Sequence, residues 1–197
     1  MKRALPNKIA EVMSSRILVA SLGIAITLQI TGGGTAWGQN LADCVRDTAS
    51  ADLVAKTDFQ REMRDLVVQS RPEFEALATV NRDLQTLLAE AWRAKVDYLL
   101  AHDSDRIDTT NGLARFSNFE WSDEDAANFR EESRSYRRLE NRISSLKEQN
   151  NDHPDWPELR EYFRDGLIQS ADFKALMARF QIQQSNVETA IARCRRD

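Results

Sequence analysis

The residues best placed for chemistry are arginines between positions 130 and 142. Like charges four positions apart share one face of a helix and repel each other by about 0.2–0.5 kcal/mol. An anionic ligand or an acidic protein surface would relieve this repulsion. The alternative is a solvated face paired with Glu131, Glu132 and Glu140. The candidate anion-binding residues are Arg130, Arg134, Arg137, Arg138 and Arg142.

A second candidate surface lies at one end of the predicted fold. Phe116, Phe119 and Trp121 lie in the last part of the long irregular stretch between His102 and Trp121. Such rings are typical of a lid over a helical core, and when exposed they mark interfaces. We expect the basic side chains at the end of the chain to share this pole. They are Arg193, Arg195 and Arg196.

The patterns for metals and cofactors are not met. A calcium loop starting at Asp103 would need an acid or Asn at its fifth position and Gly at its sixth, where the chain has Ile107 and Asp108. A haem ligand would have to point into the core, whereas His102 and His153 both fall in predicted turns. The Glu-x-x-His repeats of a di-iron bundle are lacking as well. We therefore expect neither a metal nor a cofactor.

A small helical enzyme is the alternative to a binding protein. Arg82, Arg93 and Lys95 could converge in a pocket for an anionic substrate. In the predicted fold the two histidines lie at opposite ends, which excludes a shared Ser–His–Asp site. A concealed pocket with convergent charges would favour the enzyme, and charges confined to the outside would favour the binding module.

Residues 1–38 have the pattern of a signal peptide. A basic segment precedes an apolar run at residues 17–30, and small residues stand before Gln39. An uncleaved anchor is the alternative, since a membrane-spanning helix needs about 20 residues. Three glycines at positions 32–34 argue against it, because each costs about 1 kcal/mol in a helix relative to Ala. We expect export to the periplasm or the extracellular space, with residues 39–197 as one domain.

The chain contains two cysteines, Cys44 and Cys194. In an oxidising compartment, two cysteines with no third to compete most simply form one disulfide. A metal site is less favoured, because two thiolates need further ligands and both histidines lie far from either cysteine in sequence. The sequence therefore predicts a Cys44–Cys194 bond.

The charge balance restricts the partners. Four of the 27 basic residues and one of the 31 acidic residues precede Gln39, so residues 39–197 carry a net charge of about −7. Binding to nucleic acid or to an anionic membrane would favour an excess of positive charge. We expect another protein as partner, no nucleic acid, and no stable membrane insertion after cleavage. The oligomeric state is left open.

Apolar residues recur with helical rather than strand spacing from Leu41 onward, which predicts an all-α domain. Thr57–Gln60 resembles a capping box and predicts a break or kink in the first helix. Asp155 is a predicted cap, and Gly166 with Ser170 predicts a break before the last segment. The expected helices span residues 41–69, 74–101, 123–150 and, in two pieces, 156–195.

Four helices joined by short turns favour an antiparallel, up-down-up-down bundle with coiled-coil-like packing. Only an even number of passes brings Cys44 and Cys194 to the same end, so the expected disulfide and the expected topology agree. The sequence contains no catalytic motif. We therefore expect an exported helical binding module, either chaperone-like or an adaptor.

Overall fold

The computed structural model describes residues 41–194, apart from the side chain of Arg115. Every regular element in this part of the chain is helical. The predicted leader and its cleavage site lie outside the described residues, as do Arg195 and Arg196. The long helices are α2 (Leu41–Ser70), α3 (Glu75–His102), α6 (Arg134–Asn151) and α8 (Ala171–Ile191). The shorter elements are η1 (Pro72–Phe74), η2 (Ser104–Arg106), α4 (Gly112–Ser117), α5 (Asp123–Glu132), α7 (Trp156–Asp165) and η3 (Leu167–Gln169).

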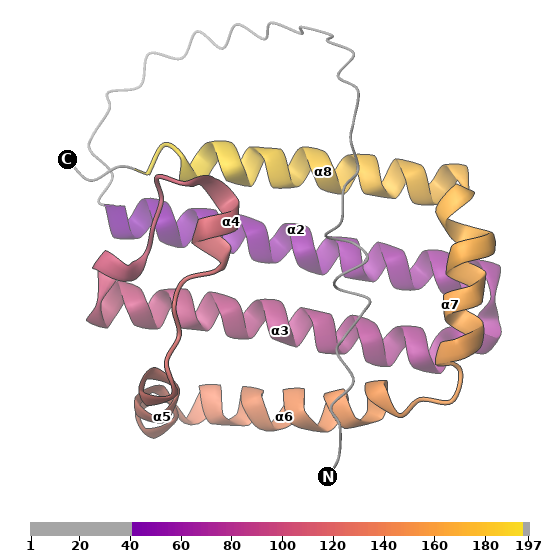
Figure 1. Ribbon diagram of the computed structural model, residues 1–197, viewed down its shortest axis with the longest axis horizontal. Coiled ribbons are helices and arrows are strands. Elements are labelled where there is room, and N and C mark those ends of the chain that lie inside the picture. The colour runs from indigo at the N-terminus through magenta and orange to yellow at the C-terminus, as the bar shows by residue number, and fades with distance from the viewer. Residues whose placement is uncertain (1–40, 195–197) are drawn as a thin grey trace, which may run out of the picture. The chain divides into compact units, whose positions relative to one another are not determined.

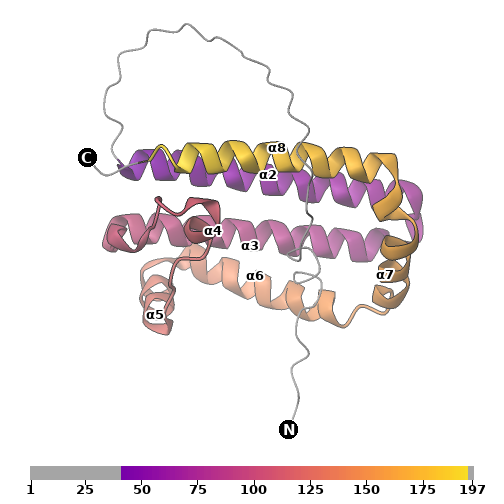
Figure 2. The ribbon, with the colours of Figure 1, turned by 45° about the horizontal axis from the view of Figure 1, so that its top comes forward.

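The four long helices lie side by side in the order α8, α2, α3, α6 (Figures 1 and 2). Neighbours in this order run in opposite directions (Figure 1). Helix α2 packs against both α3 and α8, and α3 also packs against α6. Helices α8 and α6 therefore occupy the two edges of the row (Figure 2).

Three groups of buried side chains hold this arrangement. One fills the end covered by α7, where Phe74 and Leu77 meet Leu159 and Leu167. The second surrounds the disulfide and reaches Phe116 of α4. The third joins α6 to α3. Burying these apolar surfaces is the main stabilising contribution to such a fold.

Serine side chains cap the starts of α5, α6 and α8. At α5 the Ser122 hydroxyl accepts from the Asp125 backbone N–H, while the Asp125 carboxylate accepts from the Ser122 backbone N–H. At α6 and α8 the Ser133 and Ser170 hydroxyls accept from the backbone N–H groups of Tyr136 and Phe173. These side chains pair backbone N–H groups that a helix start leaves without partners.

Several local predictions were wrong. Helix α2 runs unbroken through the expected kink, because Ala55, Phe59 and Met63 keep its buried stripe in register. The expected 123–150 helix is divided at Ser133 into α5 and α6. The side chain of Asp155 makes no capping hydrogen bond at α7. The expected irregular stretch contains η2 and α4, with Gly112 in the left-handed region at φ 73°.

One carboxylate is buried between α2 and α8. Asp52 is fully buried and lies 2.5 Å from the Lys56 amine. The Gln184 amide donates to its other oxygen at 3.1 Å. A buried charge is tolerated when it is paired and hydrogen-bonded. This polar contact therefore helps to specify how α8 is aligned on α2.

Candidate functional site

The disulfide joins the start of α2 to the residues just after α8. Cys44 and Cys194 are bonded, with their Cα atoms 5.6 Å apart, which confirms the sequence prediction. The Thr109 hydroxyl donates to the Cys194 carbonyl at 2.7 Å. The bond and this contact place the loop after α3 against the end of α8.

The aromatic residues of that loop pack inward. Phe116 is fully buried and meets the edge of Trp92, with ring centroids 5.2 Å apart. Phe119 stacks on Trp92, and Trp121 lies beside Tyr98. Phe116 is therefore part of the core and is not accessible to a partner, whereas Phe119 and Trp121 are partly exposed.

The basic residues predicted for this pole are described only in part. The Arg193 side chain is exposed and makes no hydrogen bond or ion pair with another described residue. The remaining members, Arg195 and Arg196, fall outside the described residues. The structure thus brings the disulfide, the loop aromatics and Arg193 to the same end of the domain.

The break at Ser133 divides the predicted arginine row. Arg130 stands on α5 and binds both carboxylate oxygens of Glu140 at 2.6 and 3.2 Å. These bonds raise the pKa of the Arg130 guanidinium. Arg130 is therefore already paired within the chain.

The other four arginines stand exposed on α6 without a hydrogen bond or ion pair to any described residue. We call them the arginine face; it consists of Arg134, Arg137, Arg138 and Arg142. Two acids near them in sequence are engaged elsewhere, since Glu132 lies 3.3 Å from His102 and Glu140 binds Arg130. The internal pairing expected for a solvated face is not seen for these four.

The opposite side of α6 explains why the arginines point outward. Tyr136 and Ile143 are buried against Leu84 and Leu87 of α3. Burial and the nearby Glu140 carboxylate raise the pKa of Tyr136. Helix α6 is thus amphipathic, with its apolar stripe on α3 and its basic residues in solvent.

The cations proposed for an enzyme pocket have separate environments. Arg82 pairs with the adjacent Asp83. Arg93 bonds to Ser50 at 3.2 Å and pairs with Asp97. Lys95 lies 4.9 Å above the Trp121 ring, and its burial lowers the pKa of its amine. The three side chains do not share a common anion site.

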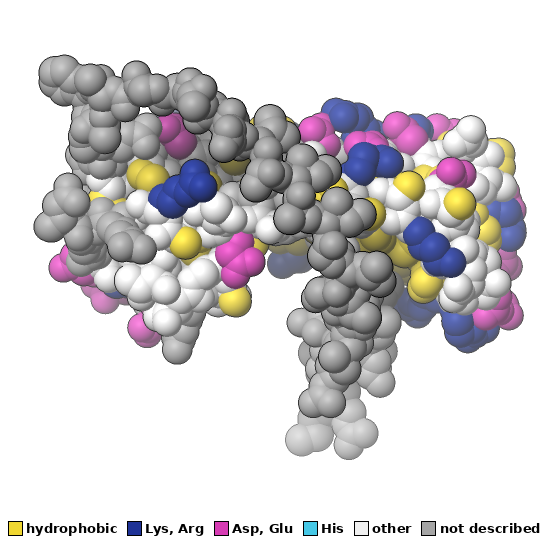
Figure 3. Space-filling model, turned by 90° about the horizontal axis from the view of Figure 1, so that it is seen from above, with side chains coloured by type: hydrophobic (Ala, Val, Ile, Leu, Met, Phe, Trp, Pro, Cys, Tyr) yellow, Lys and Arg dark blue, Asp and Glu magenta, His cyan; other side chains and the backbone are white. Residues whose placement is uncertain are grey.

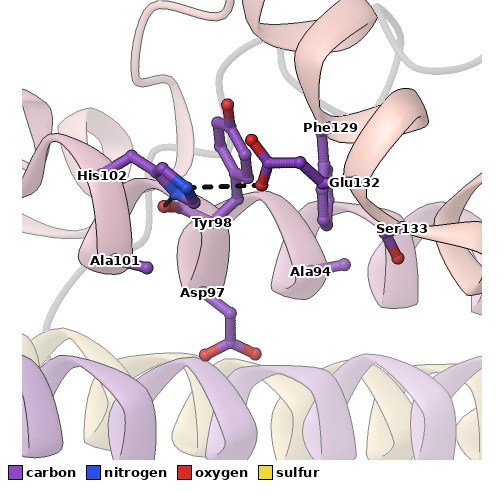
Figure 4. A pocket seen from close by; sticks show the side chains of 8 residues that line it. All are labelled: Ala94, Asp97, Tyr98, Ala101, His102, Phe129, Glu132 and Ser133. Atoms are coloured by element: carbon purple, nitrogen blue, oxygen red, sulfur yellow. Dashed lines mark hydrogen bonds and ion pairs between the residues drawn. The ribbon is translucent and has the colours of Figure 1, made fainter.

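A shallow, open depression of about 370 Å³ lies between α3 and α5 (Figure 4). The His102 Nε2 faces Glu132 across it, and the His102 Nδ1 is 2.9 Å from the Tyr98 carbonyl. Asp97 points away from this pair (Figure 4). Ser133 caps α6 by accepting from the Tyr136 N–H. The residues that line the depression are Ala94, Asp97, Tyr98, Ala101, His102, Phe129, Glu132 and Ser133.

This depression does not match the pocket that an enzyme for anionic substrates would need. Its lining contains neither Arg nor Lys. Within residues 41–194, no group of three or more metal-ligating side chains comes together. No helix in this part of the chain is long and apolar enough to span a membrane.

Comparison with known proteins returned no match among family models, curated proteins or solved structures.

Proposed function

We propose that this protein is an exported interaction module that binds an acidic partner protein through the arginine face of α6. The observation that carries the proposal is the set of four exposed arginines without a partner among the described residues. Residues 39–197 are acidic as a whole, so this positive group stands out from the rest of the domain. Guanidinium groups bind carboxylates with paired, charge-assisted hydrogen bonds.

An acidic protein fits this surface better than a lipid bilayer. A membrane-bound helix normally inserts large apolar side chains beside its basic ones. The exposed large hydrophobic residues among the described ones are Val54, Ile168 and Ile182, and none of them lies on α6. The arginine face therefore offers charge without an apolar anchor.

The export and the finer topology belong to the same proposal. The basic and apolar pattern of residues 1–38 supports a cleaved leader. The disulfide is compatible with an oxidising compartment. The alternating directions of the long helices support an up-down-up-down bundle, in which α2 and α3 separate the two edge helices.

The test compares two triple variants with equal loss of charge. The first carries Arg134→Gln, Arg138→Gln and Arg142→Gln. The control carries Arg61→Gln, Arg164→Gln and Arg179→Gln, which are exposed arginines paired with acids of this chain. The probes are a polyglutamate peptide and vesicles of anionic lipid, each measured at increasing salt concentration.

We expect the protein and the control to bind the peptide in a salt-dependent manner, and the α6 variant to bind at least about tenfold more weakly. Circular dichroism should show equal helix content for all three proteins. Equal peptide binding by both variants would refute the role of the arginine face. Binding to vesicles without binding to the peptide would replace the acidic protein by a lipid surface.

A further inference from the structure

The outer side of α8 has a second regular pattern. Its buried side carries Phe173, Leu176, Val187 and Ile191. On the opposite side, exposed apolar or small residues recur at alternating spacings of four and three. We call this row the outer seam; it consists of Ala171, Ala175, Ala178, Ile182, Ser185, Thr189 and Ala192. The spacing is that of the a and d positions of a heptad repeat.

The outer seam is accessible. Helix α8 is at one edge of the row, with α2 on its inner side (Figures 1 and 2). Ile182, near the middle of the seam, is 63% exposed, more than Val54 or Ile168. Where Figure 3 leaves this side of the domain uncovered, white and yellow surface is visible among the acidic and basic groups.

Charged residues flank the outer seam at defined heptad positions. One flank carries Asp172 and Arg179, followed by Arg193 in the turn just after α8, and the other carries Lys174 and Glu188. Arg179 binds Glu62 of α2 at 2.5 Å. The other four side chains are exposed and make no hydrogen bond or ion pair with a described residue. Each flank thus has one acid and one base without a hydrogen bond or ion pair to a described residue, near opposite ends of the helix. The Glu188 carboxylate lies beside Gly112 of α4, at the border of the exposed face.

The order of charges along the flanks of α8 is complementary to that of a second copy in one orientation. When two copies of α8 lie antiparallel about a two-fold axis near Ile182, each flank faces the same flank of the other copy. Asp172 of one copy then lies opposite Arg193 of the other, to within about two residues. Lys174 likewise lies opposite Glu188 of the other copy, to within about two residues. The symmetry repeats each contact, and no like charges meet among these four.

A parallel pair would be less favourable. In that orientation each flank faces the other flank, so Lys174 would meet Arg179 of the second copy. Glu188 would meet Arg193, and this attraction would offset the repulsion, whereas both contacts are attractive in the antiparallel pair. The small residues of the outer seam would let two backbones approach closely, with Ile182 as the largest apolar contact. Charge order and exposure therefore favour the antiparallel arrangement.

We propose that this protein self-associates as an antiparallel, two-fold dimer through the outer seam of α8. The occupant of this exposed helix face is a second copy of the same chain. The arginine face is on the opposite edge of the row, so this association does not depend on the binding proposed for α6.

The test measures the average molar mass as a function of protein concentration at low salt. It uses analytical ultracentrifugation of the purified protein without any ligand. We expect a monomer–dimer equilibrium whose dissociation constant rises at least about tenfold in Ile182→Asp and in Lys174→Glu. Restoring complementarity in the double variant Lys174→Glu/Glu188→Lys should return the dissociation constant to near that of the parent. As a control, Val54→Asp, at a position 59% exposed on α2, should leave it unchanged.

Three results would overturn the proposal. The first is a monomer at every soluble concentration. The second is a dimer that none of the α8 variants weakens. The third is tighter association in Lys174→Glu, because the introduced carboxylate would face Arg179 of the second copy in a parallel pair. Circular dichroism of each variant separates loss of association from loss of folding.

Discussion

At the scale of single residues, the contact between Arg106 and Asp125 links the loop after α3 to the start of α5. The guanidinium reaches both carboxylate oxygens at 2.9 and 2.8 Å. The same carboxylate completes the capping box with Ser122. The hydrogen bonds from Arg106, followed by those from Ser122, lower the pKa of Asp125 well below its usual range.

The folded-state pKa of Asp125 is lowered, so its carboxylate stabilises the folded protein fully above the unfolded-state pKa of about 3.9. This stabilisation is lost as the pH falls through the folded-state pKa. We predict that Asp125→Asn destabilises the protein by about 1 kcal/mol at neutral pH, the usual worth of a helix cap. The difference from the parent should shrink as the pH falls below about 4. Urea unfolding between pH 7 and pH 2 measures it, and a difference independent of pH would contradict the assignment.

Residue patterns predicted the disulfide correctly because only two cysteines were available. They did not predict that Phe116 is buried while Phe119 and Trp121 are only partly covered. Nothing in the residue type distinguishes these three rings. Phe116 and Phe119 both pack on Trp92, whose indole N–H donates to the Ser117 carbonyl at 3.2 Å and joins α4 to α3. That contact joins residues 25 positions apart, so it lies beyond local sequence patterns.

At the scale of elements, the division of the third predicted helix has a geometric cause. Phe129 and Tyr136 are seven positions apart, which in a continuous helix would place them about 10.5 Å apart along the axis. Their ring centroids are 4.1 Å apart. Only a break between them allows both rings to stack, and Ser133 provides it while capping α6. Periodicity predicted the helical content of this stretch, whereas the stacking of Phe129 on Tyr136 goes with the break at Ser133.

The start of α4 depends on a backbone conformation that suits glycine. Gly112 has φ 73°, and an added Cβ would lie 3.1 Å from the Glu188 carboxylate. We predict that Gly112→Ala destabilises the protein by about 1 kcal/mol or more, since Ala is strained in this region. Gly166→Ala is the control, because that residue has a negative φ of −138° and its nearest neighbouring atom would be 3.5 Å away. Urea unfolding midpoints of the two variants test this, and equal shifts would speak against it.

At the scale of the whole molecule, the helical class and the meeting of Cys44 and Cys194 were predictable from the sequence. The shared pole of disulfide and loop is also found, with Ile107, Phe116 and Cys194 in one buried group. The order of the helices was not predictable. The apolar stripe of a helix does not specify which neighbour it packs on. Among the long helices, α6 packs extensively on α3 alone, and this choice follows from side-chain packing rather than from periodicity.

The disulfide closes a loop of 150 residues. In the chain-entropy account such a crosslink contributes about 5 kcal/mol, by restricting the unfolded chain. We predict that Cys44→Ala/Cys194→Ala lowers the free energy of unfolding by several kcal/mol, up to this value. Hydrogen exchange should speed up most around Val45 and Ile191, and least around Phe74 and Leu77 at the α7 end. Unchanged stability, or uniform loss of protection, would contradict this prediction.

The same bond determines how the domain would respond to pulling. Tension applied through segments before Cys44 and after Cys194 would cross the sulfur–sulfur bond and bypass the helices between them. The intervening residues would carry no load, so the fold could not be unravelled from its ends until the bond is reduced. In the oxidised protein, the domain would therefore behave as a short, nearly inextensible link of 5.6 Å between the two Cα atoms.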